Sequence, residues 1–390
     1  MYNINMKKRL NVLIAVLLAV CVSIFFSACG SVQTVRLNSS DGVERVVQDD
    51  TPIYDNTETP ETKDKSVVQD NVAESKPAAD EIIKSDSVSD AQEDDNNNGR
   101  AGAVDSDDND EELDKLYDFT LVTDEDGESY YKIALKESLR DEVTEIVVPD
   151  TYRGLHITEL DEYAFYSCDN LTSIVIPQGI RVIGDYAFYG CKKLADLRLQ
   201  EGLQTIGRSA FISCYTLTSV TLPDGLVSLG QQAFRYCSNL EEVVFPESLQ
   251  TIERDTFYHC ENLSKVYFAE GLTTIGQMAF YYCTNLNDVS FPESLQTIGM
   301  GAFLHCDSFT QITLPKNVTT LDSSAFAVCY GLESVTILGH NVTIGNSAFT
   351  NCRNLTEVTI LGSIESMGTG AFANCPKLET VIMPFPGKEA

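Results

Sequence analysis

The feature that most constrains this chain is a phenylalanine that recurs every 23 residues from Phe165 to Phe372. Ala precedes each of these residues, except that Thr256 precedes Phe257, and Cys follows each of them three positions later. A fixed period of this length without insertions is typical of a solenoid, whose units are too small to bury a core alone and must stack. The recurring residues are Phe165, Phe188, Phe211, Phe234, Phe257, Phe280, Phe303, Phe326, Phe349 and Phe372.

One unit shows which local structures the repeat can form. Alternating Ile174 and Ile176 predict a short strand with one face turned inward. A second extended piece follows and ends at Gly184, and the spacing of Phe188 and Cys191 predicts a single helical or 3₁₀ turn laid against the strand. Stacking such units gives parallel strands about 4.8 Å apart.

The motif Leu-x-x-Ile-x-Ile-Pro-x-Gly-Ile-x-x-Ile-Gly-x-x-Ala-Phe-x-x-Cys resembles the BspA-type leucine-rich repeat of bacterial surface proteins. It can be followed from Leu171 to Ala390, and residues 143–168 look like an enlarged first repeat. The resemblance implies an α/β leucine-rich-repeat solenoid, with short parallel strands and one helical or 3₁₀ turn in each 23-residue unit. We therefore assign residues 143–390 to about ten BspA-type repeats.

The N-terminus has the pattern of a targeting segment. Three basic residues at positions 7–9 precede the apolar stretch Leu10–Phe26, which ends in Ser-Ala-Cys at Cys29. This resembles the lipobox of bacterial lipoproteins, with Phe26 where Leu is usual. The resemblance implies that residues 1–29 are a lipoprotein signal peptide and that Cys29 carries the lipid. The protein would then be exported and anchored to the outer face of the bacterial cell membrane, at the cell surface. Cleavage without lipid and an uncleaved anchor are the alternatives.

Residues 30–116 differ in composition from the repeats. Positions 31–116 hold 24 acidic and eight basic side chains, and Tyr54 is their only aromatic residue. A segment with so little apolar surface cannot offset its ordering entropy, so we expect a disordered acidic linker. Residues 117–142 read as an N-terminal hairpin that caps the first repeat, with a turn at residues 124–127. At the other end, Pro384 and Pro386 are expected to block further strand addition.

Charge and motif content exclude several classes of function. The net charge of −31 repels phosphate backbones, so no nucleic-acid partner is expected. No histidine stands in a motif with a nucleophile, and the chain has no phosphate-binding loop, so we predict neither an enzyme nor a cofactor. The cysteines have no Cys-x-x-Cys spacing, and we predict no metal site. Disulfides between neighbouring units are the alternative to a buried cysteine column, but parallel side chains would hold their Cβ atoms too far apart.

Outward positions of the strands are the candidate protein-binding face, because function in a solenoid lies on such a surface. Aromatic and basic anchors are frequent at interface hot spots, and here they are Arg198, Lys265 and Tyr267. The complete set is Asp196, Arg198, Thr221, Glu242, Val244, Lys265, Tyr267, Asp288 and Ser290. An ordinary Thr- and Ser-rich strand face is the alternative interpretation.

A second column is acidic in five consecutive repeats. It consists of Glu201, Asp224, Glu247, Glu270 and Glu293. Carboxylates about 5 Å apart repel one another by less than about 1 kcal/mol per pair in water, so simple exposure accounts for them. A bound cation or a basic partner is the alternative.

Two hypotheses about function remain. The first is a non-catalytic surface lipoprotein whose repeats bind an extracellular protein; the family resemblance implies adhesion to host matrix or to surface proteins of other cells. The second is an envelope scaffold or solute-capture lipoprotein that acts within the cell wall. In both, the N-terminal lipid provides the contact with the membrane.

Overall fold

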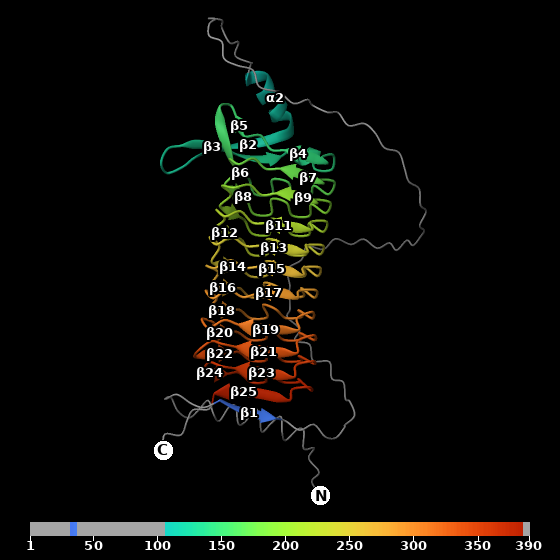
Figure 1. Cartoon of the computed structure of the whole chain (residues 1–390). Helices are drawn as coiled ribbons and strands as arrows, with labels where there is room; N and C mark the ends of the chain where they lie inside the picture. Colours follow the sequence, from blue (N-terminus) through green and yellow to red (C-terminus); the bar gives the residue numbers. More distant parts are fainter. Residues whose placement is uncertain (1–31, 37–105, 385–390) are drawn as a thin grey trace, which may run out of the picture. The chain divides into compact units, whose positions relative to one another are not determined.

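The computed structural model describes residues 32–36 and 106–384 (Figure 1). Cys29, the predicted signal peptide and most of the predicted linker lie outside these residues. Among the described elements, no helix has the length and apolar character needed to cross a membrane.

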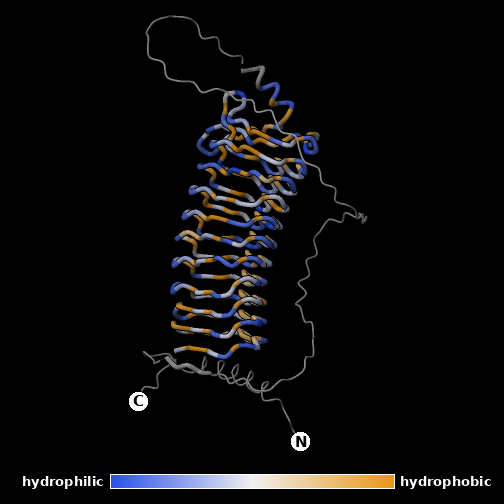
Figure 2. The backbone as a smooth tube through the Cα atoms, turned by 45° about the vertical axis from the view of Figure 1, so that its right-hand side comes forward, coloured by the Kyte–Doolittle hydropathy of each residue, from blue (hydrophilic) through white to orange (hydrophobic). Residues whose placement is uncertain are grey.

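Each repeat contributes two short strands, and these stack in parallel in two ladders (Figure 1). The first ladder contains β4 (Glu145–Val147), β7 (Ser173–Val175), β9 (Asp196–Arg198), β11 (Ser219–Thr221), β13 (Glu242–Val244), β15 (Lys265–Tyr267), β17 (Asp288–Ser290), β19 (Gln311–Leu314), β21 (Ser334–Ile337), β23 (Glu357–Ile360) and β25 (Thr380–Pro384). The second contains β6 (Leu155–Leu160), β8 (Val182–Ile183), β10 (Thr205–Ile206), β12 (Ser228–Leu229), β14 (Thr251–Ile252), β16 (Thr274–Ile275), β18 (Thr297–Ile298), β20 (Thr320–Leu321), β22 (Val342–Ile344) and β24 (Ile364–Met367). Hydrophobic and hydrophilic stretches alternate along each coil (Figure 2), as expected for strands with one buried face.

A β-hairpin covers the N-terminal edge of the second ladder. Its strands β2 (Tyr117–Thr123) and β3 (Ser129–Leu135) are antiparallel, and β3 pairs in parallel with β6. The short strand β5 (Thr151–Tyr152) pairs with β6 inside the enlarged first repeat. A 3₁₀ turn, η1 (Glu137–Leu139), follows the hairpin.

Two elements lie within the range expected to be a disordered linker, and there the structure differs from the prediction. Helix α2 (Ser106–Leu116) is held by Asp114, whose carboxylate accepts hydrogen bonds from the Tyr152 hydroxyl at 2.5 Å and from Arg153 Nη2 at 3.1 Å. Leu113 of the same helix packs against the core. Composition indicated disorder, whereas these contacts with the first repeat order the helix.

The second element, β1 (Val32–Arg36), pairs antiparallel with β25 from Val32↔Pro384 to Arg36↔Thr380. The expectation that the terminal prolines block strand addition is therefore wrong at Pro384. The physical reason is that Pro384 lacks only its own N–H, so the other residues of the edge strand keep their donors and acceptors.

The segment around each core Phe is a series of turns and not the expected helical or 3₁₀ turn. Tyr163 and Ser167, two positions before and after Phe165, have φ angles of 59° and 55°, and the equivalent two positions are left-handed in all ten units. A helix needs consecutive right-handed residues. Here left-handed and right-handed residues alternate, so every second backbone N–H donates to a carbonyl of the next coil. Phe165 N, for example, donates to Ala187 O at 2.7 Å. Helical structure in residues 106–384 is thus confined to α2 and η1.

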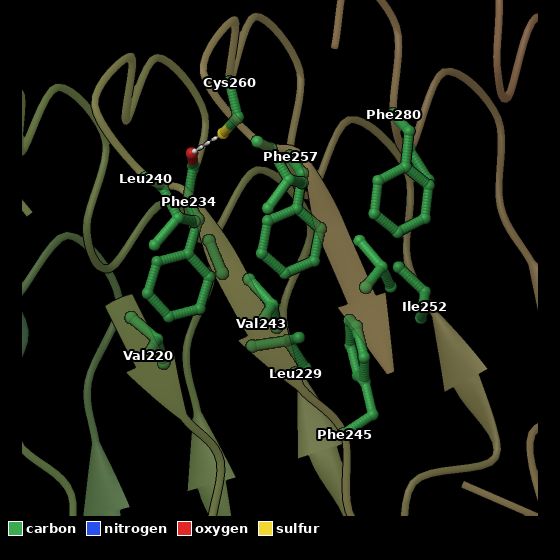
Figure 3. Packing of buried hydrophobic residues seen from close by; sticks show 14 of the residues in the cluster. Val220, Leu229, Phe234, Leu240, Val243, Phe245, Ile252, Phe257, Cys260 and Phe280 are labelled. Carbon is green, nitrogen blue, oxygen red and sulfur yellow. Dashed lines mark hydrogen bonds between the residues drawn. The ribbon is translucent and has the colours of Figure 1, made fainter. Parts of the chain in front are cut away.

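The core is a stack of phenylalanine rings. Phe234, Phe257 and Phe280 lie face to face with centroids 5.5 and 5.3 Å apart, and none of the three is exposed (Figure 3). The cysteine column runs beside this stack as free thiols. Each Sγ from Cys191 to Cys375 donates to the carbonyl of a Phe in the preceding coil, as Cys260 does to Phe234 O at 3.2 Å (Figure 3).

We predict that all ten array cysteines alkylate when the protein is denatured without reductant, whereas the buried ones resist alkylation in the folded state. Burial raises the pKa of Cys237 to about 12, so its thiol is neutral and unreactive at pH 8. Peptide mapping by mass spectrometry after iodoacetamide treatment measures both states. Unmodified array cysteines in the denatured sample would mean that the column is bridged.

Candidate functional site

The central part of the predicted binding face is a continuous surface on the first ladder. Strands β11, β13, β15 and β17 pair without a register shift. One outward row is therefore Thr221, Val244, Tyr267 and Ser290, and the other is Ser219, Glu242, Lys265 and Asp288. We call these eight residues the strand-face patch. Inward residues between the two rows, such as Val243 and Val266, are buried and fix the strands from behind.

Within this patch, an exposed aromatic ring lies beside an ion pair. Tyr267 is 44 % exposed, and its row neighbour Val244 is half-buried. Lys265 Nζ lies 3.9 Å from Glu242 Oε2 in the adjacent strand, and the two side chains are 49 % and 43 % exposed. Such an exposed pair contributes at most about 1 kcal/mol to stability, so both charges remain available to a partner.

Asp196 and Arg198 lie on the neighbouring strand of the same ladder, outside the hydrogen-bonded sheet of the patch. Their strand β9 is hydrogen-bonded to β7 but not to β11. The Arg198 guanidinium points back to its own strand, with Nε 3.2 Å and Nη2 3.4 Å from the Asp196 carboxylate oxygens. The structure therefore does not bring Arg198 into the hydrogen-bonded sheet that carries Tyr267.

Two exposed apolar residues at the N-terminal end of the same face were missed by the sequence analysis. Val147 and Val175 precede Arg198 in its row and are 71 % and 49 % exposed. Their exposure could have been predicted from the sequence. Both residues occupy the outward third position of their strands, β4 and β7, as Val244 and Tyr267 do in later repeats.

The acidic column is exposed in all five repeats. One of its carboxylates is used inside the fold, since Glu270 accepts hydrogen bonds from the backbone N–H groups of Glu293 and Ser294 at 3.1 and 3.2 Å. Glu293 itself lies 3.8 Å from Lys316 Nζ. Exposure and these contacts account for the column, and within residues 106–384 no group of three or more metal-ligating side chains is placed to hold an ion.

The turns carry a second set of aromatic residues that the sequence analysis did not single out. They occupy the first and second positions after the core Phe, and stack from coil to coil: Tyr236, Tyr258, His259, Tyr281, Tyr282 and His305. We call this set the aromatic turn face. The sequence could have revealed this set, because aromatic residues recur one and two positions after Phe234, Phe257, Phe280 and Phe303.

Short parallel strands, a 23-residue coil and a continuous apolar column define a leucine-rich-repeat solenoid. The sequence matches the family described as BspA type leucine rich repeat region, in six copies, over residues 158–287 and 273–388. The chain therefore belongs to the BspA-type leucine-rich-repeat family. The match indicates a protein-interaction fold and no family of enzymes.

Solved structures of bacterial leucine-rich-repeat proteins are similar to this chain. A protein from Bacteroides ovatus is 26 % identical with a TM-score of 0.50, over 67 % of this chain and 80 % of that one. The TpLRR protein of T. pallidum is 28 % identical with a TM-score of 0.32, over 68 % and 88 % of the two chains. A protein from Eubacterium ventriosum is 22 % identical with a TM-score of 0.41, over 68 % and 82 %. No curated protein matches this chain.

Proposed function

We propose that the protein is a non-catalytic, exported lipoprotein whose repeat array binds an extracellular protein through the strand-face patch. The partner class is a host-matrix protein or a surface protein of another cell. The observation that carries the proposal is the unbroken row Thr221–Val244–Tyr267–Ser290, which presents an aromatic side chain to water on a rigid ladder. Since the ladder is ordered before binding, little entropy is lost when a partner docks.

The adjoining acidic column gives the surface its electrostatic preference. Glu247 and Glu270 are exposed and follow the strands that carry Val244 and Tyr267. A partner with a basic patch is therefore favoured, and its association should weaken as the salt concentration rises. Lipid on Cys29 would hold the array at the outer face of the membrane.

Tyr267→Ala should weaken binding of the partner by about 2 kcal/mol, or roughly 30-fold in Kd, because aromatic side chains at the centre of a patch dominate interface energies. The separate variant Glu247→Lys should also weaken partner binding, and it should reduce the salt dependence of that binding. Surface plasmon resonance against a panel of purified extracellular-matrix proteins measures both effects. The thermal unfolding midpoint of Tyr267→Ala should match the parent, since the ring is exposed. Binding that neither substitution alters would contradict the proposal.

The second candidate is an envelope scaffold or solute-capture lipoprotein within the cell wall. The two are separated by labelling intact cells with an antibody raised against the array. Labelling of intact cells supports the adhesion proposal. Labelling only after the wall is digested supports the second candidate.

A further inference from the structure

The two ends of the chain meet at the C-terminal edge of the first ladder. There the strand beside β25 is β1, which comes from the other end of the sequence (Figure 1). The two strands form five residue pairs, from Val32↔Pro384 to Arg36↔Thr380. Successive strands of the first ladder form three or four pairs. The pairing of β1 with β25 is therefore longer than the pairings that join the coils of this ladder.

The sequence of β1 favours an edge strand. Three of the five residues in Val32–Arg36 are β-branched, which strands prefer. No acidic residue lies between Cys29 and Asp41, whereas the residues beyond Asp41 are rich in Asp and Glu. The register places Val35 opposite Val381, the residue that continues the inward column of the ladder in β25. This short stretch is thus distinguished from the acidic segment that follows it.

The open end of the solenoid explains why a strand binds there. A last strand without a neighbour leaves a row of N–H and C=O groups unpaired. The core residues of the last coil are also less covered, since Phe372 and Leu378 are half-buried whereas Phe349 and Leu355 of the preceding coil are fully buried. At the N-terminal end, the hairpin β2–β3 covers the edge of the second ladder. β1 covers the C-terminal edge of the first.

Chain connectivity ties β1 to the membrane anchor. Only Gly30 and Ser31 separate Val32 from Cys29. A chain spans at most about 3.6 Å per residue, so Cys29 lies within about 11 Å of the start of β1. An uncleaved anchor in Leu10–Phe26 would bring the same end of the array closest to the membrane, because it also precedes β1 directly.

The opposite end of the array lies far from this point. Neighbouring rings of the phenylalanine stack are 5.0–5.5 Å apart, so the stack from Phe165 to Phe372 is about 45–50 Å long. Helix α2 and the hairpin lie at the Phe165 end, and residues 37–105 connect them to β1. Along the sequence, α2 is the first element of the array that follows β1. The pairing with β25 reverses this order in space, because it brings the last coil closest to the anchor.

We propose that β1 is a clasp that holds the C-terminal coil at the membrane anchor, so that the array projects outward with its N-terminal hairpin farthest from the membrane. This inference rests on the proposed function for the anchor itself. The net charge of −31 disfavours contact between the sides of the array and an anionic membrane surface. Val147 and Val175, which are 71 % and 49 % exposed, then lie near the outer tip, where a partner arrives first.

Cross-linking of the full chain tests the clasp. Thr34→Cys/Ile382→Cys places two thiols on directly opposed residues. Their Cβ atoms should be about 4.5–5.5 Å apart, within reach of bismaleimidoethane. In the matched control, Thr34→Cys/Thr313→Cys, the second cysteine has the equivalent position on β19, three strands away from β25. We expect at least tenfold more cross-linked peptide from the first variant, measured by mass spectrometry of the monomer band of a denaturing gel.

Energy transfer to labelled lipid tests the orientation. Lys193→Cys and Lys377→Cys introduce a donor dye at the same exposed position of two distant coils. Both chains also carry Cys375→Ser, because Cys375 is the half-buried thiol among the described array cysteines. The full-length lipoprotein is reconstituted in phosphatidylcholine vesicles that contain a rhodamine-labelled lipid as the acceptor. We expect transfer from position 377 to be at least threefold more efficient than transfer from position 193.

A proline variant connects the two measurements. In an antiparallel pair, the N–H groups of alternate residues face the neighbouring strand. Thr34→Pro/Val35→Pro must therefore remove an N–H group that faces β25. The difference in transfer efficiency between positions 377 and 193 should fall by at least half in this variant. Thr34→Ala/Val35→Ala is the control, since it keeps both N–H groups and should retain the difference.

Each measurement can contradict the proposal. A cross-link yield no higher than that of the Thr313 control would show that β1 is not paired with β25. Cross-links found only between two chains would replace the clasp with a strand-exchanged dimer. Equal or lower transfer from position 377 would contradict the orientation. A chain that does not incorporate into vesicles would contradict the anchor of the proposed function and with it the orientation, whereas the cross-link would still decide whether the clasp exists.

Discussion

Phe257→Ala is expected to lower the free energy of unfolding by about 3–5 kcal/mol, the usual cost of removing a fully buried phenylalanine. The ring is stacked between Phe234 and Phe280 and contacts Phe245 edge-on at 5.7 Å, so no neighbour can move to fill the cavity without breaking its own stack (Figure 3). Urea unfolding followed by far-UV circular dichroism measures the effect.

Phe257 lies in the middle of the array, and this position shapes the expected transition. Each coil contacts only its neighbours, so a weakened central coil uncouples the two halves of the solenoid. We expect the unfolding curve of the variant to broaden or divide into two steps. Tyr267→Ala is the control, because substitutions of exposed side chains usually change stability by less than about 0.5 kcal/mol. A loss below about 1 kcal/mol for Phe257→Ala would show that the ring stack is not the core.

Gly362→Ala is expected to destabilise the C-terminal coils by at least about 2 kcal/mol, because it forces a methyl group into filled space. A Cβ at this position would lie 1.6 Å from the backbone oxygen of Gly339, which cannot move without shifting its own coil. Gly339 is in turn tight, with 2.2 Å between a Cβ placed there and Val318 O. Differential scanning calorimetry of the full chain measures the loss.

Gly225→Ala is the matched control for that substitution. The nearest atom to a Cβ at Gly225 is Leu203 O at 3.6 Å, an ordinary contact, and its φ is not in the left-handed region. Alanine there should be neutral or slightly stabilising, since it reduces the entropy of the unfolded chain. Equal effects of the two substitutions would mean that the close approach of the coils at Gly362 is not real.

The fold was predictable because the core residues recur at fixed positions in every 23-residue repeat. Phe and Cys recur in phase, and every array cysteine except the half-buried Cys375 is fully buried. The register of the strand-face patch followed from the same period. The shape of the turns was not predictable, because Ala-Phe-x-x-Cys fits a helical turn and an alternating turn equally well. The left-handed positions decide between them, and residues such as Tyr163 and Ser167 give no glycine signal there.

Other features could not be predicted from the sequence because they depend on contacts between segments that lie far apart in the chain or in neighbouring coils. Helix α2 is ordered by bonds from Tyr152 and Arg153 to Asp114, which composition alone does not reveal. At the position of the acidic column, Lys316 follows Glu293, and the next two coils have Gly339 and Gly362, where the close approach of neighbouring coils leaves no room for a side chain. These features depend on the packing geometry between neighbouring segments, and the 23-residue period alone does not specify that geometry.

The central claim is that a partner protein binds the strand-face patch, and a comparison of two tyrosine variants tests it most directly. Tyr267→Ala and Tyr281→Ala are measured side by side against the matrix protein that binds the parent, at low and at physiological salt. We predict a roughly 30-fold loss for Tyr267→Ala and parental affinity for Tyr281→Ala. Parental affinity for Tyr267→Ala together with loss of binding for Tyr281→Ala would place the partner on the turns and contradict the claim.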